Sequence, residues 1–167
     1  MALRSMVGLS EPHMLELPGR RLATVVTTGD PDKVGPPAVK ALYLAVDDVR
    51  THNKFELEPL RVRWPMQQDD PRDEWVAMWG VPVPADVEHM PRIDEEYPAN
   101  VQEWEYGAVA EVLHEGSRAE KRKAIDRLYQ YMSEQHFEVI GPHEEEYLSP
   151  PDAAVPRTFI RYRVRLR

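Results

Sequence analysis

The sequence contains no cysteine, which excludes disulfide bonds, thiolate catalysis and cysteine-ligated zinc sites. It has no apolar run as long as a membrane-spanning helix, and its apolar start, residues 1–9, is too short and too broken for a signal peptide. A net charge of −8 disfavours direct binding to nucleic acids or anionic membranes. We therefore expect a cytoplasmic protein that binds neither.

Sequence motifs that hold common cofactors are also missing. There is no phosphate-binding glycine loop, no Gly-x-Ser-x-Gly elbow and no His-Glu-x-x-His. The histidines show no close metal-ligand spacing; they are His13, His52, His89, His114, His136 and His143. No cofactor and no metal site are predicted.

What is present fits a soluble globular domain. The chain has 167 residues, of which 42% are apolar and 30% charged, and this length suffices for one domain with a real core. Periodicity predicts the order strand–helix–strand–strand twice. The first set is a β-branched strand over 21–28, a helix that Gly35-Pro36-Pro37 sets up and that ends near Val49, and strands over 57–64 and 74–79 around an acidic loop, 67–71. The second set is a strand over 103–114, a helix over 118–134, a strand over 137–148 kinked at Gly141-Pro142, and a strand over 158–166.

The two halves also share short sequence motifs. Ala41-Leu42-Tyr43 corresponds to Arg127-Leu128-Tyr129, and Phe55-Glu56 corresponds to Phe137-Glu138. This internal repeat predicts an α+β fold, in which two units pool their strands into antiparallel sheet and lay two main helices on it. The expected boundaries are a loosely held N-terminal arm over 1–20, repeat one over 21–82, a connecting loop over 83–102 and repeat two over 103–167.

The arginines of the last strand have two interpretations. They could form a basic patch, but Ile160, Tyr162, Val164 and Leu166 alternate with Arg161, Arg163 and Arg165. A period of two favours a half-buried strand with its arginines in water.

The stretch His143-Glu144-Glu145-Glu146-Tyr147-Leu148 is the most unusual in the chain. It lies between Gly141-Pro142 and a Ser-Pro-Pro break at 149–151, and its length is that of one strand. Because side chains alternate, either face must turn at least one glutamate toward the core. A buried carboxylate needs a partner, a proton or a ligand; otherwise this is an edge strand whose charges face water.

Aromatic residues supply a second signal. Trp75 and Trp79 share a face of one predicted strand, and Trp64, Trp104 and Tyr106 lie in or beside strands. They either fill the core or form the walls of a pocket for a planar, apolar or cationic ligand.

Two further polar residues remain open. Glu111 shares a face with Val109 and Leu113, so it is a second inward acid if that face is inward and a surface charge if it is not. His114 is either a pocket residue or a polar group at the end of a strand.

Four short motifs of the sequence together resemble those of the GyrI-like small-molecule-binding domains. These motifs are Gly29-Asp30-Pro31, Ala41-Leu42-Tyr43, Leu113-His114-Glu115-Gly116 and Glu145-Glu146-Tyr147-Leu148-Ser149. The last is similar to the family's Glu-x-Tyr-Leu pattern, and the resemblance runs from about Leu17 to Leu166. The family's relatives include effector-binding domains of multidrug-sensing regulators.

The resemblance implies a ligand cleft between the two repeats, with Glu145 pointing into it and Tyr147 beside it. It also implies one of three roles. The first is binding of small hydrophobic, planar or cationic molecules by a stand-alone domain, with Trp75, Trp79, Tyr106, Trp104 and His114 as further candidate ligand-binding residues. The second is hydrolysis of strained cyclopropyl rings in DNA-alkylating compounds, without metal. The third is inhibition of a topoisomerase through protein contact, although no partner motif is present.

For the hydrolase alternative we assign three catalytic residues. Glu145 is the general base that activates water, Tyr147 is the donor to the developing phenolate with Tyr106 as second choice, and Glu111 orients the water. The departures from the family are Glu144 and Glu146, which make the local field more acidic than in the commoner Glu-Ile-Tyr-Leu text.

Overall fold

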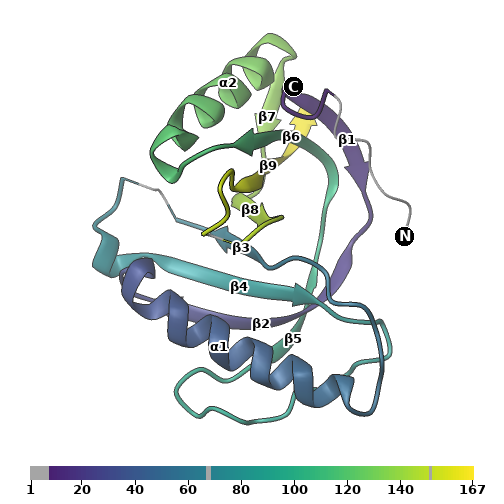
Figure 1. Cartoon of the computed structure of the whole chain (residues 1–167). Coiled ribbons are helices and arrows are strands. Elements are labelled where there is room, and N and C mark those ends of the chain that lie inside the picture. The colour runs from purple at the N-terminus through teal and green to yellow at the C-terminus, as the bar shows by residue number, and fades with distance from the viewer. Residues whose placement is uncertain (1–7, 67–68, 151) are drawn as a thin grey trace. The chain divides into compact units, whose positions relative to one another are not determined.

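A computed structural model of the chain describes residues 8–66, 69–150 and 152–167. Residues 1–7 of the expected arm, Gln67 and Gln68 of the acidic loop, and Pro151 of the Ser-Pro-Pro break lie outside the described residues. In the described part the fold is α+β, with nine strands and two α-helices (Figure 1). The predicted fold class is confirmed, and within each half of the chain the strands pair antiparallel.

The chain divides into two compact units. We call Gly19–Glu105 the first-repeat unit, and the described residues up to Pro18 together with Tyr106–Arg167 the second-repeat unit. The first-repeat unit contains β2 (Arg20–Thr28), α1 (Pro31–Arg50), β3 (Arg61–Trp64), a 3-10 turn η1 (Arg72–Glu74), β4 (Val76–Pro82) and β5 (Asn100–Trp104). Its strand order is β3-β4-β2-β5.

The second-repeat unit has the same plan. It contains β1 (His13–Leu17), β6 (Gly107–Glu115), a 3-10 turn η2 (Arg118–Glu120), α2 (Lys121–Glu134), β7 (Phe137–Val139), β8 (His143–Tyr147) and β9 (Arg157–Leu166). Its strand order is β1-β6-β9-β8, with β7 also paired to β9. The repeated strand–helix–strand–strand order is therefore confirmed.

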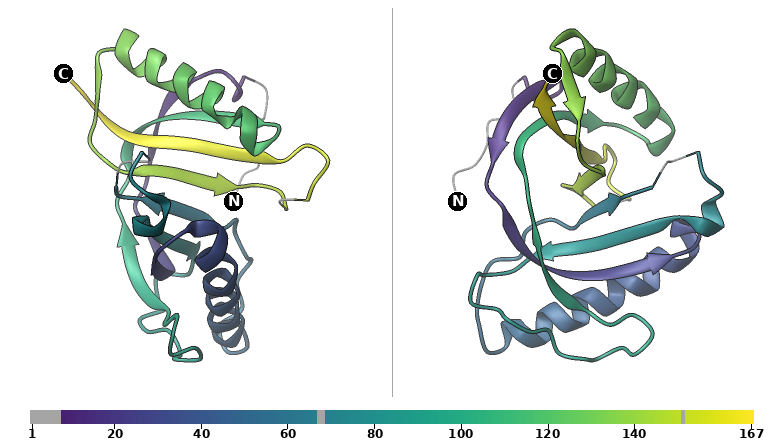
Figure 2. Two further views of the ribbon diagram at one scale, coloured as in Figure 1. Left: turned by 90° about the vertical axis from the view of Figure 1, so that its left-hand side faces the viewer. Right: turned by 180° about the vertical axis from the view of Figure 1, so that it is seen from behind.

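Each helix covers one face of its own sheet. Helix α1 packs on β2 and β4, and α2 packs on β6 (Figures 1 and 2). Leu42 and Leu128, the leucines of the text that the halves share, are both fully buried. In the second-repeat unit this helix-facing core consists of Ala110, Val112, Ala124, Ile125, Leu128, Met132, Ile160, Tyr162 and Val164.

Several boundaries differ from those predicted. Helix α1 begins at Pro31 rather than near Gly35, because the Asp30 side chain accepts a hydrogen bond from the Asp32 N–H and Pro31 suits the first turn. The strand expected over 103–114 is two strands, β5 and β6, and the strand over 137–148 is also two, β7 and β8. Part of the expected arm forms β1, because residues 13–17 pair with the edge of β6.

The equivalence of the two units is visible at one glycine in each. Gly29 and Gly116 both follow the first strand of their repeat with φ near +134°. Each donates its N–H to the residue that precedes the paired strand, Gly29 to the Trp75 carbonyl and Gly116 to the Pro156 carbonyl, at 2.8 and 2.9 Å. A side chain at such a φ is strained, so glycine fixes this turn in both repeats.

We expect Gly29→Ala and Gly116→Ala each to destabilise the fold by about 1–3 kcal/mol, the usual strain of a side chain in such a backbone conformation. At Gly116 an added Cβ would also meet the Glu120 carboxylate at 2.7 Å. Gly19→Ala is the matched control, since its φ is ordinary and its Cβ would only touch the Trp104 carbonyl at 3.4 Å. Urea unfolding measures all three; equal stability of Gly19→Ala and the other two variants would contradict the expectation.

Candidate functional site

Both faces of β8 are buried at its centre. Glu144 is 2% exposed and Glu145 is 1% exposed, so the interpretation of an edge strand with its charges in water is wrong. In the register with β9, Glu144 lies opposite Arg161 and Glu145 lies opposite Ile160. Because Ile160 belongs to the core under α2, Glu145 points to the helix side of the sheet and Glu144 to the other side.

Glu145 is held by three donors of the second-repeat unit. The Lys121 ammonium donates to Oε1 at 2.9 Å, and the Tyr147 hydroxyl donates to the same oxygen at 3.1 Å. The His143 Nε2 lies 2.7 Å from Oε2. His143, Glu145 and Tyr147 thus share one face of β8, as strand alternation predicts, and Lys121 reaches them from the first turn of α2.

These donors decide the charge of Glu145. Burial alone would raise the pKa of its carboxyl group, but the hydrogen bond from His143 and the charge of Lys121 more than offset burial and lower the pKa to about 2. The carboxylate is therefore ionised at neutral pH. Because an ionised carboxylate only accepts hydrogen bonds, His143 donates through Nε2–H.

A chain of polar contacts continues from His143 into the core. Its Nδ1 lies 2.6 Å from the Tyr162 hydroxyl, across the strand pair. Burial, followed by the neighbouring Tyr129, raises the Tyr162 pKa well above its usual range, so the phenol keeps its proton. The Tyr162 hydroxyl therefore stays neutral in its hydrogen bond with the His143 ring. Tyr147 is also protonated, because burial and the charge of Glu145 raise its pKa.

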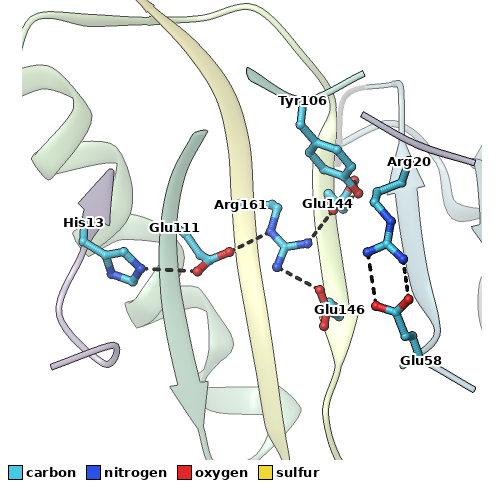
Figure 3. A network of polar contacts seen from close by, with 8 residues as sticks. All are labelled: His13, Arg20, Glu58, Tyr106, Glu111, Glu144, Glu146 and Arg161. Atoms are coloured by element: carbon cyan, nitrogen blue, oxygen red, sulfur yellow. Dashed lines mark hydrogen bonds and ion pairs between the residues drawn. The ribbon is translucent and has the colours of Figure 1, made fainter. Parts of the chain in front are cut away.

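The opposite face of the same sheet carries a separate network around Arg161 (Figure 3). Its guanidinium donates to Glu111 and Glu144 at 2.8 Å and to Glu146 at 2.9 Å. The network extends to His13 of β1, whose Nε2 lies 3.3 Å from Glu111. Burial alone would lower the Arg161 pKa, but the three carboxylates raise it above its usual range, so the cation persists.

This network overturns part of the expectation for the last strand. Arg165 is exposed, as expected, but Arg161 is only 2% exposed. The reason is the cluster of carboxylates on the adjacent strands, which replaces the hydration of the guanidinium. Leu166, expected to face the core, is 72% exposed.

Glu111 and Tyr106 do not lie beside Glu145. Glu111 is fully buried, and so is an inward acid, but it bonds Arg161 on the face opposite to Glu145. The Tyr106 hydroxyl donates to Glu144, at 2.8 and 3.0 Å to its two oxygens. The sheet therefore separates both residues from Glu145, and neither is placed to orient water or donate a proton there.

His114 lies one residue before the end of β6 and contacts the turn that follows the strand. Its Nε2 lies 2.9 Å from the Ser117 carbonyl, in the turn before α2. It is 7% exposed. In the register of β6, β9 and β8 it lies in one row with Thr158 and Tyr147, and its role in ligand binding stays a prediction.

The tryptophans belong to the first-repeat unit. Trp64 makes edge contacts with Trp75 and Trp79, at ring-centroid distances of 6.2 and 6.4 Å. Trp79 donates to Thr27 and packs on α1 at Gly35, which is the contact pattern of a core residue. Trp104 stacks under the Arg63 guanidinium, whose central carbon lies 4.3 Å from the ring centroid. The role of Trp75, Trp79 and Trp104 as pocket walls stays a prediction.

No group of at least three His, Asp or Glu side chains suited to a metal ion occurs among the described residues. In the same part of the chain, every helix is too short or too polar to cross a membrane.

The two repeats differ in charge at the position of Glu145. Glu145 opposite Ile160 corresponds to Val62 opposite Trp79, since the flanking pairs Arg61 with Gly80 and Glu144 with Arg161 are in the same register. Aligning the helices on Leu42 and Leu128 places Lys121 at the position of Gly35. The first repeat thus has two uncharged residues, Gly35 and Val62, at the positions of the ion pair, and it keeps the same plan without these charges.

Sequence reasoning missed Lys121 and the pairing of His143 with Glu145. A signal was available: aligning the helices on Leu42 and Leu128 places Lys121 where the first repeat has Gly35, which is a charged residue at an uncharged position. The contact itself joins residues 24 positions apart, which no local pattern reveals.

Comparisons with known proteins show the fold. No family model matches the chain, and no curated protein matches it. Among solved structures, an uncharacterized conserved protein from Listeria innocua has a TM-score of 0.83 and 21% identity, covering 95% of this chain and 94% of its own. A hydrolase from Listeria innocua has a TM-score of 0.79 and 20% identity, covering 96% and 94%. The EcmrR C-terminal domain has a TM-score of 0.70 and 14% identity, covering 94% and 98%.

The depressed pKa of Glu145 predicts a specific pH dependence of stability. Its folded-state pKa of about 2 lies below the ordinary 4.5, so its contribution is present above pH 4.5 and is lost as pH falls toward 2. This pKa shift corresponds to a contribution of about 3 kcal/mol to the free energy of unfolding. We expect the difference in unfolding free energy between wild type and Glu145→Gln to narrow over that window in urea titrations. Glu134→Gln, on the exposed side of α2, is the control; a Glu145→Gln difference that stays constant down to pH 2 would contradict the expectation.

The Arg161 network predicts a large effect of removing its cation. Arg161→Met leaves Glu111 and Glu144 buried without the guanidinium, so we expect a loss of about 3–5 kcal/mol in unfolding free energy. Adding Glu111→Gln should recover part of the loss, because one buried charge is removed with its partner. Chemical denaturation of the single and double variants measures this coupling, and strict additivity would show that the pair does not interact.

Proposed function

We propose that the second-repeat unit binds a small, flat or compact hydrophobic molecule that carries a positive charge, with Glu145 as the anionic floor of the site. The observation that carries this proposal is the ionised, buried Glu145 with its three donors, at a position where the other repeat has a valine. A buried charge that the fold does not require costs stability, and recognition of a ligand is the common reason to keep one.

The fold supports the same proposal at a coarser level. The text around Glu145 is similar to the Glu-x-Tyr-Leu pattern of the GyrI-like domains, and the EcmrR C-terminal domain shares the fold. We therefore propose that the chain is a relative of such effector-binding domains.

Hydrolysis is supported less well than binding. Structures described as hydrolases share the fold at 20% and 19% identity, which is a likeness of fold alone. A general base works best with a pKa near the working pH, whereas that of Glu145 is about 2. Glu111 and Tyr106 lie across the sheet from it, as described above. The ring-opening and topoisomerase-inhibitor alternatives stay predictions with no contact in this site that favours them.

A titration with tetraphenylphosphonium tests the binding proposal. We expect wild type to bind this lipophilic cation and Glu145→Gln to bind it at least about tenfold more weakly, because the anion that faces the ligand is gone. Isothermal titration calorimetry gives both affinities.

Glu146→Gln is the matched control. It makes the same chemical change on the same strand, but on the face that holds Arg161, and should bind as wild type does. Equal affinity of wild type and Glu145→Gln would remove Glu145 from the site.

A further inference from the structure

The ion pair between Lys121 and Glu145 is open to water from one end only. The lysine side chain is 21% exposed, whereas the glutamate side chain is 2% exposed. A molecule that approaches Glu145 from solvent therefore meets the lysine before it meets the carboxylate.

Lys121 is also poorly stabilised by its own helix. It is the first residue of α2, where the partial positive charge of the helix N-terminus disfavours a cation. Arg118 of the preceding turn adds positive charge near Tyr147. The ammonium is held in place by Glu145, at 2.9 Å, rather than by the helix.

The other donors remain when the lysine leaves. His143 bonds Oε2, and Tyr147 bonds the Oε1 oxygen that it shares with Lys121. Exchange of the ammonium for another cation at Oε1 keeps both of these bonds and the charge balance of the buried carboxylate. The flexible lysine stem needs only a rotamer change to carry its charge into water.

We propose that Lys121 occupies the cation position of the Glu145 site in the ligand-free protein, and that a lipophilic cation binds by displacing its ammonium group. This inference rests on the proposed function and adds that the site selects cations over neutral molecules of the same shape. A cation replaces the lysine charge at Glu145, whereas a neutral molecule of the same shape leaves Glu145 no replacement and is not favoured by the exchange.

The affinity of the Lys121→Met variant tests the displacement. This change removes the ammonium and keeps an apolar stem of similar length. We expect Lys121→Met to bind tetraphenylphosphonium about tenfold more tightly than wild type, because no ion pair has to be broken. Triphenylphosphine oxide, a neutral probe of related shape, should show no comparable gain. Lys123→Met, two residues along α2 at an exposed position, should leave both affinities unchanged.

A direct readout accompanies the titration. The side-chain nitrogen signal of Lys121, assigned by its absence from Lys121→Met, should lose its ion-paired position in the NMR spectrum when wild type is saturated with tetraphenylphosphonium. A signal that keeps its position at saturation contradicts displacement.

The outcomes separate the two proposals. Displacement is wrong, while the binding function stands, if wild type binds tetraphenylphosphonium but Lys121→Met binds it no more tightly than Lys123→Met does. The same holds if Lys121→Met gains equal affinity for tetraphenylphosphonium and for triphenylphosphine oxide. If neither wild type nor Lys121→Met binds either probe, both proposals fall.

Discussion

A carboxylate removed from water keeps its charge only where donors replace the lost hydration. Glu145 has three such donors, and the rest of the second-repeat unit is arranged to supply them. Strand alternation brings His143 and Tyr147 to the same face of β8, and the glycine turn at Gly116 starts the helix so that Lys121 reaches the same oxygen as Tyr147. The site thus depends on one strand and one helix start, both fixed by backbone geometry.

The single sheet that carries this site has two different polar systems on its faces. On the helix side, one carboxylate meets one lysine and a hydrogen-bond chain that runs through His143 to Tyr162. On the other side, one arginine meets three carboxylates. The arginine fork is rigid and its side chain is 3% exposed, whereas the lysine is flexible and partly exposed. The flexible lysine of the first system fits the ligand exchange proposed above, and the rigid arginine of the second cross-links β6, β8 and β9.

Much of this fold follows from the sequence, because hydrophobic period and glycine turns act locally. The repeat, the helix faces with Leu42 and Leu128, and the inward glutamates on β8 are predictable in that way. Pairing across long separations is not predictable from local pattern: His13 contacts Glu111 across 98 positions, so the sequence of β1 alone looks like part of a loose arm. Alternation places Arg161 in water, because a period of two reports which face a residue occupies and not what covers that face.

The first repeat provides an internal control for the meaning of the charges. Its unit folds on the same plan with Gly35 and Val62 at the positions of Lys121 and Glu145, and with Gly80 at the position of Arg161. Replacing a buried ion pair by apolar side chains of suitable volume is often neutral or stabilising. The plan of the fold therefore does not require the pair of Lys121 and Glu145, and the binding role proposed for Glu145 is an explanation for its presence in the second repeat.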